Sequence, residues 1–235
     1  MNTAYPESVR FLYALGNEFK TIKLGLERIK TLLAALDHPE RSCRFVHVAG
    51  TNGKGSTCAM LERVLRDSGL RTGLYTSPHL VEPTERVRIC GEPVSGEEFA
   101  WAFSQIHEAA ESLVARGAID MHPTYFETVT AMAYLLFRQR AVEVAVLETG
   151  MGGRLDATNV VDPQLCVITP IDFDHEKFLG NTIAQIAHEK AGIIKPGRPA
   201  VTSRQHGEAM HVLEQRAAET GSPLIRAASW RVDHL

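Results

Sequence analysis

The chain has 235 residues, of which 44% are apolar and 23% charged, as in an ordinary soluble globular protein with one large domain or two small ones. Its net charge of −3 excludes a basic field that would recruit nucleic acid or an anionic membrane. No apolar run approaches the roughly 18 residues of a membrane span, and the first residues lack the layout of a signal peptide. Composition therefore favours a cytoplasmic protein, expected to be monomeric, that acts on a small molecule.

The first half of the chain alternates between helical and strand periodicity. One apolar helix face at a 4-3-4-3 spacing consists of Ile22, Leu26, Ile29, Leu33 and Leu36. A short apolar run at 45–49 predicts a buried strand, and a glycine-rich turn follows it. The next helix should end near residue 69, and residues 72–76 predict a second strand. The apolar residues expected to line that helix are Cys58, Leu61, Val64 and Leu65.

Capping signals mark the helices of the second half. An S-x-x-E motif opens a helix at 95 that should end near 117, T-x-x-E opens another at 124, and T-x-x-Q opens a third at 182 that should end at Gly192. Strands are predicted at 142–149, 165–169, 200–202 and 224–226, with a helix near 207–219. This alternation predicts an α/β fold, with a mainly parallel sheet flanked by helices. Ligands of such sheets bind at the carboxyl ends of the strands.

A glycine-rich turn follows the first buried strand and reads AGTNGKGST at 49–57. Glycine permits close approach of the backbone to a ligand, and successive N–H groups at a helix start bind anions. Lys54 adds a cation for phosphate oxygens. The strict P-loop pattern G-x-x-x-x-G-K-[ST] is not met, because Val48 stands in place of its first glycine and Gly55 in place of its hydroxyl residue. The turn nevertheless predicts a phosphate site rather than an ordinary connection.

Seven further segments, together with this turn, carry a resemblance to a known family. They are LGLERI at 24–29, TSPHL at 76–80, ERVRICG at 85–91, TYFE at 124–127, ETGMGGRLDATN at 148–159, DHEKFLG at 174–180 and EKAGIIKPG at 189–197. The chain resembles the Mur ligase superfamily, in the form found in folylpolyglutamate and dihydrofolate synthases. The resemblance covers nearly the whole chain and implies a P-loop NTPase-like central domain over residues 1–235.

The resemblance implies a binding site for ATP and Mg²⁺. The implied ATP-binding residues are Thr51, Asn52, Gly53, Lys54, Gly55, Ser56 and Thr57. The implied metal ligands are Ser77, Glu148 and His175. Taken alone, Glu148 at the end of an apolar strand could equally be a solvent-exposed strand end, and Ser77 a turn residue. Magnesium prefers oxygen ligands, so His175 enters the ligand set through the resemblance and not through its chemistry.

Two further residues, Lys190 and Asp172, bear on the implied metal site. Helical periodicity alone makes Lys190 an exposed lysine, whereas the resemblance implies a carbamylated lysine that supplies an oxygen ligand and acts in catalysis with Lys54, Glu148 and His175. Asp172 stands where many members of the family have glycine, and an additional carboxylate there would alter metal binding or water structure.

The segment GMGG at 150–153 follows a strand and must be compared with a dinucleotide fingerprint. The third glycine of G-x-G-x-x-G would fall on Leu155, which argues against that interpretation. The resemblance instead assigns pteroate or folate contacts to Thr124, Tyr125, Phe126, Glu127, Leu155, Asp156 and Ala157. Thr124 and Glu127 also form a capping box, and both roles can hold together. Arg86 and Arg88 are expected to be solvated.

The implied activity is an ATP-dependent ligase that adds L-glutamate to dihydropteroate or folyl-(poly)glutamate through an acyl phosphate. Dihydrofolate synthase, folylpolyglutamate synthase and a bifunctional enzyme remain open. Another Mur-type amide ligase and a non-catalytic ATP- or folate-binding module are the alternatives. The family's second, Rossmann-like domain is not expected within these 235 residues, so weak or no ligase activity is predicted for them alone.

Overall fold

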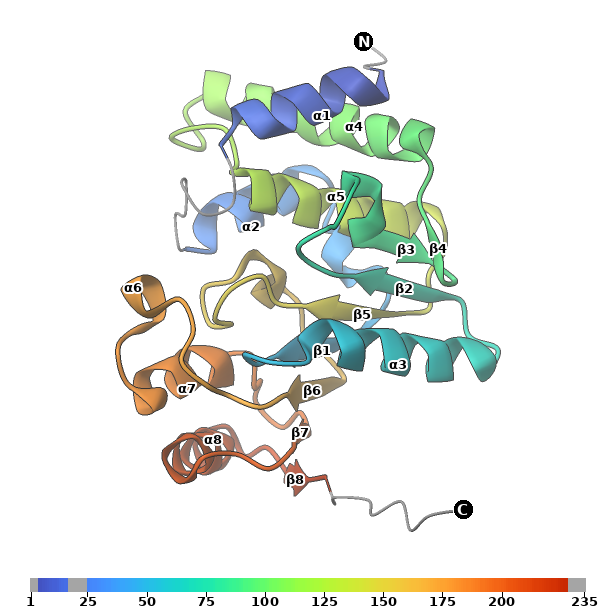
Figure 1. Ribbon diagram of the computed structural model, residues 1–235. Helices are drawn as coiled ribbons and strands as arrows, with labels where there is room; N and C mark the ends of the chain where they lie inside the picture. The colour runs from blue at the N-terminus through green and yellow to red at the C-terminus, as the bar shows by residue number, and fades with distance from the viewer. Residues whose placement is uncertain (1–3, 17–24, 228–235) are drawn as a thin grey trace.

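The computed structural model describes residues 4–16 and 25–227, and the statements below concern these residues. The strands are β1 (Arg44–Ala49), β2 (Thr72–Tyr75), β3 (Val87–Ile89), β4 (Glu92–Pro93), β5 (Val144–Glu148), β6 (Leu165–Ile168), β7 (Ala200–Thr202) and β8 (Leu224–Arg226). They form a single sheet in the order β4-β3-β2-β5-β1-β6-β7-β8 (Figure 1). Six of these strands run parallel, and only β3 and β4 pair antiparallel at one edge.

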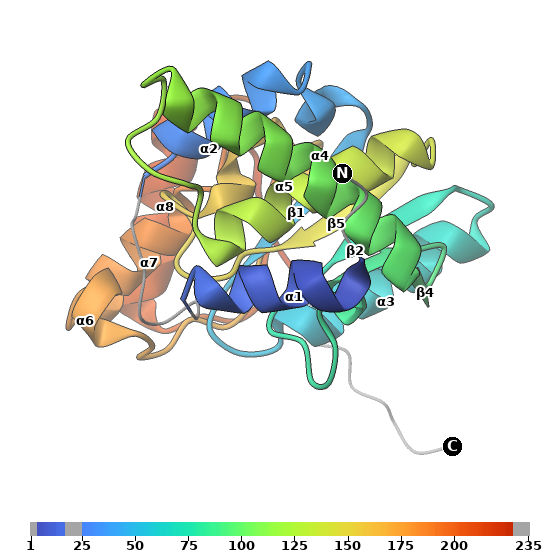
Figure 2. The ribbon, with the colours of Figure 1, turned by 90° about the horizontal axis from the view of Figure 1, so that it is seen from above.

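Helices cover both faces of the sheet. They are α1 (Tyr5–Ala14), α2 (Glu27–Ala35), α3 (Lys54–Asp67), α4 (Gly96–Ala115), α5 (Tyr125–Gln139), α6 (Glu176–Leu179), α7 (Ile183–Ala191) and α8 (Gly207–Thr220). Helix α3 packs on one face of the central strands, and α5 and α7 pack on the other. Helices α1 and α4 form a further layer beyond α5 (Figures 1 and 2).

The alternation of side chains along β1 explains this layering. Phe45 joins the core cluster that contains α5, and Ala49 joins the cluster that contains α7. Val46 and Val48 point to the opposite face, where they pack with Cys58 of α3. Because successive residues of a strand face opposite sides, an apolar run of this length requires cover on both faces. The predicted α/β fold with a mainly parallel sheet is confirmed.

The capping signals located three helices correctly. The side chains of Ser95, Thr124 and Thr182 each accept a hydrogen bond from the backbone N–H three residues later, at the starts of α4, α5 and α7. Side-chain capping satisfies an N–H group that has no partner within the helix, so the motif is informative without knowledge of the tertiary fold. The predicted end of α7 at Gly192 is also confirmed.

Several sequence expectations need correction. The antiparallel strands β3 and β4 were not anticipated, because strands of three and two residues are too short to show a period. Helices α1 and α6 were missed as well. Val64 is 65% exposed and does not line the buried face of α3. The side chains of Cys58, Leu61 and Leu65 face the sheet, and Val64 lies to one side of this stripe on the helix surface. Ile22, predicted on an apolar helix face, lies outside the described residues.

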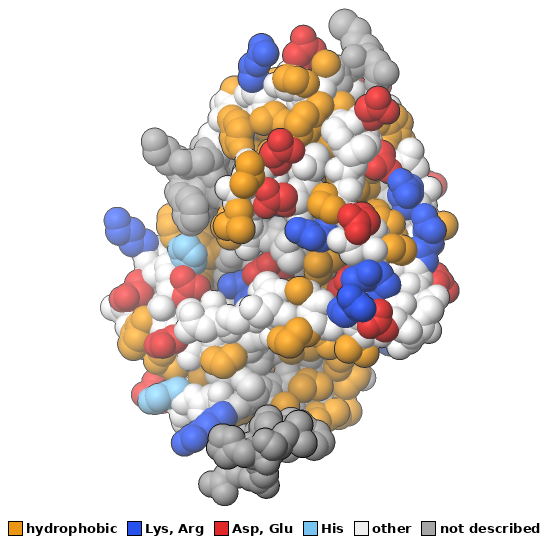
Figure 3. Space-filling model, turned by 45° about the vertical axis from the view of Figure 1, so that its right-hand side comes forward, with side chains coloured by type: hydrophobic (Ala, Val, Ile, Leu, Met, Phe, Trp, Pro, Cys, Tyr) orange, Lys and Arg blue, Asp and Glu red, His pale blue; other side chains and the backbone are white. Residues whose placement is uncertain are grey.

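The charge distribution on the surface agrees with the expectation from composition. Lys and Arg side chains are interspersed with Asp and Glu on the face shown in Figure 3, so no large field of one sign forms there. In the described part of the chain, no helix combines the length and the apolar character needed to cross a bilayer. All four cysteines are free thiols, and Cys58 and Cys166 are buried.

Candidate active site

The carboxyl ends of β1, β2, β5 and β6 bring the predicted site residues to one edge of the sheet. In the parallel register, Val48 of β1 lies beside Glu148 of β5, and Ala49 lies beside Ile168 of β6. The turn after β1, the segment after β2 that contains Ser77, and the segment after β6 that leads to His175 therefore start side by side. Parallel sheets bind their ligands at this end, where the carboxyl ends of the strands lie.

The turn from β1 to α3 leaves a helix start open toward the site. Gly50 has φ of 147°, and a Cβ there would lie 1.9 Å from Thr169 Oγ1, so only glycine fits. Gly53 has φ of 80° and precedes Lys54, the first residue of α3, without any side-chain cap. Ser56 and Thr57 lie in the first turn of this helix. Its uncapped N–H groups carry the partial positive charge of the helix dipole and suit an anionic ligand.

Hydrogen bonds fasten this turn to the segment after β6. The backbone N–H groups of Thr51 and Asn52 both donate to Pro170 O, at 3.0 and 3.2 Å. Thr51 Oγ1 donates to Asp172 O at 3.0 Å and is 3.1 Å from Asp172 N. The carboxylate of Asp172 is exposed and accepts a hydrogen bond from Phe173 N at 2.8 Å. The backbone of Asp172 thus joins the two segments, and its side chain shapes the turn.

Glu148 is a buried carboxylate and not a solvent-exposed strand end, because it is only 5% exposed. Its Oε2 accepts a hydrogen bond from Ser77 N at 3.2 Å, and its carboxylate lies within 3.7 Å of where a Cβ on Gly55 would stand. Burial raises the pKa of Glu148, while the Ser77 N–H and the Lys54 charge oppose that rise. Ser77 and Glu148 are therefore brought together beside the start of α3.

Lys190 is the most deeply buried cation of the site, with 1% exposure. The expectation of an exposed lysine, based on helical periodicity, is wrong, because α7 turns this position toward the turn after β1. Its Nζ donates to Gly50 O at 2.7 Å and lies 3.6 Å from a carboxylate oxygen of Asp174. Burial, reinforced by the Lys54 charge, lowers the pKa of Lys190 to about 8. At this pKa a substantial fraction of the amine is neutral near physiological pH.

His175 lies close to Lys190 through a shared neighbour. Its Nε2 is 3.4 Å from an oxygen of Asp174, the same carboxylate that approaches Lys190. His175 has φ of 43° and immediately precedes α6. The Asp174 carboxylate thus lies between His175 and Lys190, and Ser77 pairs with Glu148. Asp174 was not singled out from the sequence, although it adjoins His175 within the motif DHEKFLG.

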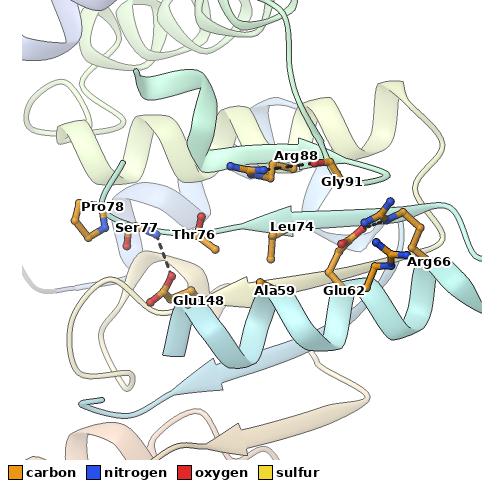
Figure 4. A pocket seen from close by; sticks show the side chains of 12 residues that line it. Ala59, Glu62, Arg66, Leu74, Thr76, Ser77, Pro78, Arg88, Gly91 and Glu148 are labelled. Carbon is orange, nitrogen blue, oxygen red and sulfur yellow. Dashed lines mark hydrogen bonds and ion pairs between the residues drawn. The ribbon is translucent and has the colours of Figure 1, made fainter. Parts of the chain in front are cut away.

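A cavity of about 480 Å³ extends from the Ser77–Glu148 pair along α3 (Figure 4). Ser77 and Glu148 lie at one end of it, and Arg66 and Gly91 lie at the other. The lining residues are Gly55, Ala59, Glu62, Arg63, Arg66, Leu74, Thr76, Ser77, Pro78, Arg88, Gly91 and Glu148. The buried carboxylate and the open helix start thus border a space large enough for a small-molecule ligand.

Thr124 and Glu127 form the predicted capping box at the start of α5. Glu127 Oε2 accepts from Thr124 N at 2.8 Å and from the Arg28 guanidinium at 2.9 Å. Its other oxygen, Oε1, is buried without a hydrogen-bond partner among the described residues. Sequence reasoning did not assign Arg28, although it lies in the quoted motif LGLERI. The ion pair joins α2 to α5, and the unpartnered oxygen is an acceptor available to a ligand N–H.

The aromatic residues of the motif TYFE are part of the packing around the site. The Tyr125 ring stacks on Tyr13 with centroids 6.0 Å apart, and Phe126 lies against Gly150, where a Cβ would come within 2.5 Å of its ring. Arg86, expected to be solvated, is 3% exposed, and its guanidinium carbon lies 5.1 Å from the Tyr125 ring centroid. The aromatic face and a hydrogen bond from Arg86 Nε to His79 Nδ1 at 2.8 Å help this arginine to tolerate burial.

Asp156 organises the segment after β5. Its carboxylate accepts hydrogen bonds from Met151 N at 2.9 Å, Thr158 N at 3.0 Å and Thr158 Oγ1 at 2.5 Å. Asp156 and Ala157 are buried, and Leu155 is half-buried. The carboxylate thus folds the segment at 151–158 into a closed turn. Of the three residues in this segment that are predicted to contact pteroate, Leu155 is the most accessible.

The chain was then compared with known proteins. Residues 48–221 match the family model of the Mur ligase middle domain. A dihydrofolate synthase/folylpolyglutamate synthase of Bacillus subtilis is 43% identical over 228 residues, which are 95% of this chain and 51% of that protein. The apo structure of L. casei folylpolyglutamate synthase has a TM-score of 0.89 at 43% identity, and the alignment covers 95% of this chain and 54% of that one.

A structure described as an FPGS–AMPPCP–folate complex matches with the same TM-score of 0.89, at 42% identity. The alignment again covers 95% of this chain and 54% of that chain. The present chain thus spans about half the length of the relatives that it matches. The family model alone covers well over half of the 235 residues. The chain therefore belongs to the Mur ligase family.

Proposed function

We propose that this chain carries the phosphate-, metal- and pteroyl-binding residues of an ATP-dependent ligase that adds L-glutamate to dihydropteroate or folyl-(poly)glutamate. The observation that supports this most is the position of the uncapped start of α3 beside the buried Glu148 carboxylate. The similarity to folylpolyglutamate and dihydrofolate synthases supports the choice of substrates. We further propose that the protein acts as a monomer in the cytoplasm.

Lys54 and the turn from Thr51 to Thr57 would bind the phosphates of ATP. The Lys54 ammonium makes only a 3.4 Å contact to Thr51 O, so it can turn toward a stronger acceptor. The first N–H groups of α3 point to the same place. Together they would neutralise charge that develops on the transferred phosphoryl group, which is most of what catalysis of phosphoryl transfer requires.

Ser77, Glu148 and His175 would hold Mg²⁺. A hydroxyl beside a buried carboxylate fits the preference of this ion for oxygen ligands, and burial, which raises the pKa of Glu148, would favour a bound cation beside it. Bound Mg²⁺ would supply charge neutralisation at the phosphate oxygens. His175 Nε2 lies 3.4 Å from Asp174, so this carboxylate would orient the imidazole toward the ion.

The proposed reaction has two steps. The carboxylate of the pteroyl or glutamyl acceptor attacks the γ-phosphorus of ATP, which forms an acyl phosphate and releases ADP. The amine of L-glutamate then attacks the acyl carbon, and inorganic phosphate leaves. The pteroyl substrate would be positioned by Thr124, Tyr125, Phe126, Glu127, Leu155, Asp156 and Ala157. The unpartnered Oε1 of Glu127 would accept a hydrogen bond from a pterin N–H. Effective catalysis here depends on positioning.

The 235-residue chain is expected to bind AMPPCP with Mg²⁺ and to be stabilised against heat by dihydropteroate, because both sites lie within it. Its ligase turnover alone is expected to be low, since the similar enzymes are about twice as long. Isothermal titration would measure nucleotide binding, thermal shift would measure acceptor binding, and mass spectrometry would detect a product that is one glutamate heavier. Dihydropteroate and tetrahydrofolate as acceptors would separate the two synthase activities.

The alternatives give different results in the same assays. Another Mur-type ligase would be stabilised by UDP-muramoyl substrates and not by dihydropteroate. A non-catalytic binding module would bind AMPPCP yet release no ADP over long incubation with dihydropteroate and glutamate. Failure to bind AMPPCP at millimolar concentration would overturn the proposed function altogether.

We also propose that Lys190 is carbamylated. The neutral amine attacks CO₂, the N–C bond forms and one proton is released. The N–H that remains can keep the hydrogen bond to Gly50 O. The new anion would stand beside Asp174, and two anions at this distance require a cation between them, as a divalent metal would provide. Carbamylation would thereby convert a buried cation into an oxygen ligand.

Carbamylation of Lys190 is expected to rise with pH as the solution passes through about 8, because only the deprotonated amine reacts and burial lowers the pKa to that value. Carbon-13 NMR with labelled bicarbonate would follow the carbamate signal between pH 6.5 and 9. Lys190→Arg should abolish the signal. Lys195→Arg, which alters a half-buried lysine that donates to Asn159 O, should retain it. A signal that survives in Lys190→Arg would assign the carbamate elsewhere.

A further inference from the structure

Two histidines and a glutamate form a cluster that the proposed reaction does not use. His107 and Glu111 are four residues apart on α4, so both side chains project from one face of the helix. His122 comes from the connection between α4 and α5. One ligand atom from each residue lies within 4.8 Å of the other two. Imidazole nitrogens with a carboxylate oxygen are a common donor set for zinc.

The hydrogen bonds of His122 fix which of its nitrogens faces the cluster. Its Nδ1 lies 2.9 Å from Pro123 O, which can only accept, so Nδ1 carries the proton. The Nε2 lone pair then points toward His107 Nδ1 at 3.3 Å. A histidine that donates one ring N–H to a backbone carbonyl and presents the other nitrogen is the usual arrangement of a metal ligand. The backbone thus orients His122 in advance.

The separation of the two nitrogens also matches a zinc site. Zinc–nitrogen bonds of 2.0–2.1 Å in tetrahedral geometry place two ligand atoms about 3.4 Å apart. The observed separation between His107 Nδ1 and His122 Nε2 is 3.3 Å. Without a metal, the His107 Nδ1–H donates to His122 Nε2. Metal binding requires that this proton move to Nε2 of His107 and that the two rings rotate slightly, so that both lone pairs converge on the metal.

Aromatic packing holds His107 in place while Glu111 stays free to move. The His107 ring stacks on Phe103 with centroids 5.4 Å apart and meets the edge of Phe11 at 4.5 Å. Phe11 also contacts the His122 ring, with centroids 5.3 Å apart. Within the described part of the chain, Glu111 makes no hydrogen bond or ion pair, and its exposed carboxylate can rotate toward the two nitrogens.

We propose that His107, Glu111 and His122 bind Zn²⁺, with water as the fourth ligand. The site is separate from the Ser77, Glu148 and His175 set, because its residues lie on α4 and in the segment before α5. Bound Zn²⁺ joins these two segments directly before Thr124, the N-cap of α5. The metal would thereby hold the start of α5, with the capping box and Glu127, in a fixed position.

Cobalt(II) titration of the untagged 235-residue chain tests this site, because tetrahedral Co²⁺ with nitrogen ligands absorbs in the visible range and Zn²⁺ does not. One equivalent of Co²⁺ is expected to produce d–d bands, and one equivalent of Zn²⁺ should remove them. His107→Gln and His122→Gln should each weaken binding at least roughly 10-fold. His211→Gln, which changes an exposed histidine on α8, should bind Co²⁺ as the natural chain does.

A second variant separates this site from the predicted magnesium site. Glu148→Gln combined with His175→Asn removes two ligands of that set and is expected to leave the d–d bands unchanged. Circular dichroism of each histidine variant checks that it is folded, and Zn²⁺ should raise the melting temperature of the natural chain but not of His122→Gln. Absence of d–d bands in the natural chain, or bands that persist in folded His107→Gln and His122→Gln, would overturn the proposal.

Discussion

Replacing Glu127 by alanine is expected to lower the free energy of unfolding by about 3 kcal/mol. The substitution removes the glutamate of the capping box at α5 and leaves the Arg28 guanidinium, in a mostly buried side chain, without its closest carboxylate. The Arg28 charge then keeps only the longer 3.4 Å contact to the exposed Asp120 among the ion pairs recorded for the described residues, and this penalty adds to the loss of the cap. Urea unfolding followed by circular dichroism would measure the change.

Glu98→Ala provides a matched control for this prediction. Glu98 is the glutamate of the capping box at α4 and pairs with Arg140, but it lies in a more exposed place. Its loss should cost about 1 kcal/mol, because solvent compensates exposed charges. If the two variants lost equal stability, burial of the Arg28–Glu127 pair would not be the cause, and a common capping effect would explain both.

Replacing Lys54 by alanine is expected to weaken binding of AMPPCP with Mg²⁺ about 100-fold, the usual effect of a lost charge-assisted hydrogen bond. Lys54 is half-buried at the first position of α3, and among the described residues its hydrogen bond is the long contact to Thr51 O. The fold should tolerate the change, since alanine is a good helix former and no buried partner is orphaned. Isothermal titration would give the ratio of dissociation constants.

Lys177→Ala is the control for Lys54, because this exposed lysine on α6 carries the same charge near the same edge of the sheet. It should change nucleotide affinity less than about 3-fold, through long-range attraction alone. An equal loss in both variants would mean that net charge, and not the contact of Lys54 with phosphate, governs binding.

Local signals in the sequence located the elements of the fold well. The three capping motifs predicted the starts of α4, α5 and α7, because a cap involves residues only three positions apart. The short strands β3 and β4 could not be found in this way, since β3 is stabilised by pairing with β2, and β4 by pairing with β3, and neither has a period of its own. Short edge strands depend on tertiary context.

The sequence predicted some features of the candidate site but not the contacts between segments that are distant in the chain. Glycine spacing indicated the phosphate turn, but it could not show that Gly50 is required by the approach of Thr169 from another strand. Lys190 shows most clearly what the sequence could not predict. Its position on the helix suggests exposure, whereas the turn after β1, which is distant in sequence, helps to bury it. The pairing of Arg28 with Glu127 joins residues 99 positions apart, and no local pattern encodes such a contact.

The hydrogen bonds from Thr51 and Asn52 to Pro170 make the turn after β1 and the segment after β6 one unit of local unfolding. Opening either segment breaks the same bonds, so neither can fluctuate independently of the other. A ligand that restrains the turn after β1 would therefore also restrain the residues that lead to His175. Occupancy of the proposed nucleotide site would thus be transmitted to His175, a proposed metal ligand, through backbone amides.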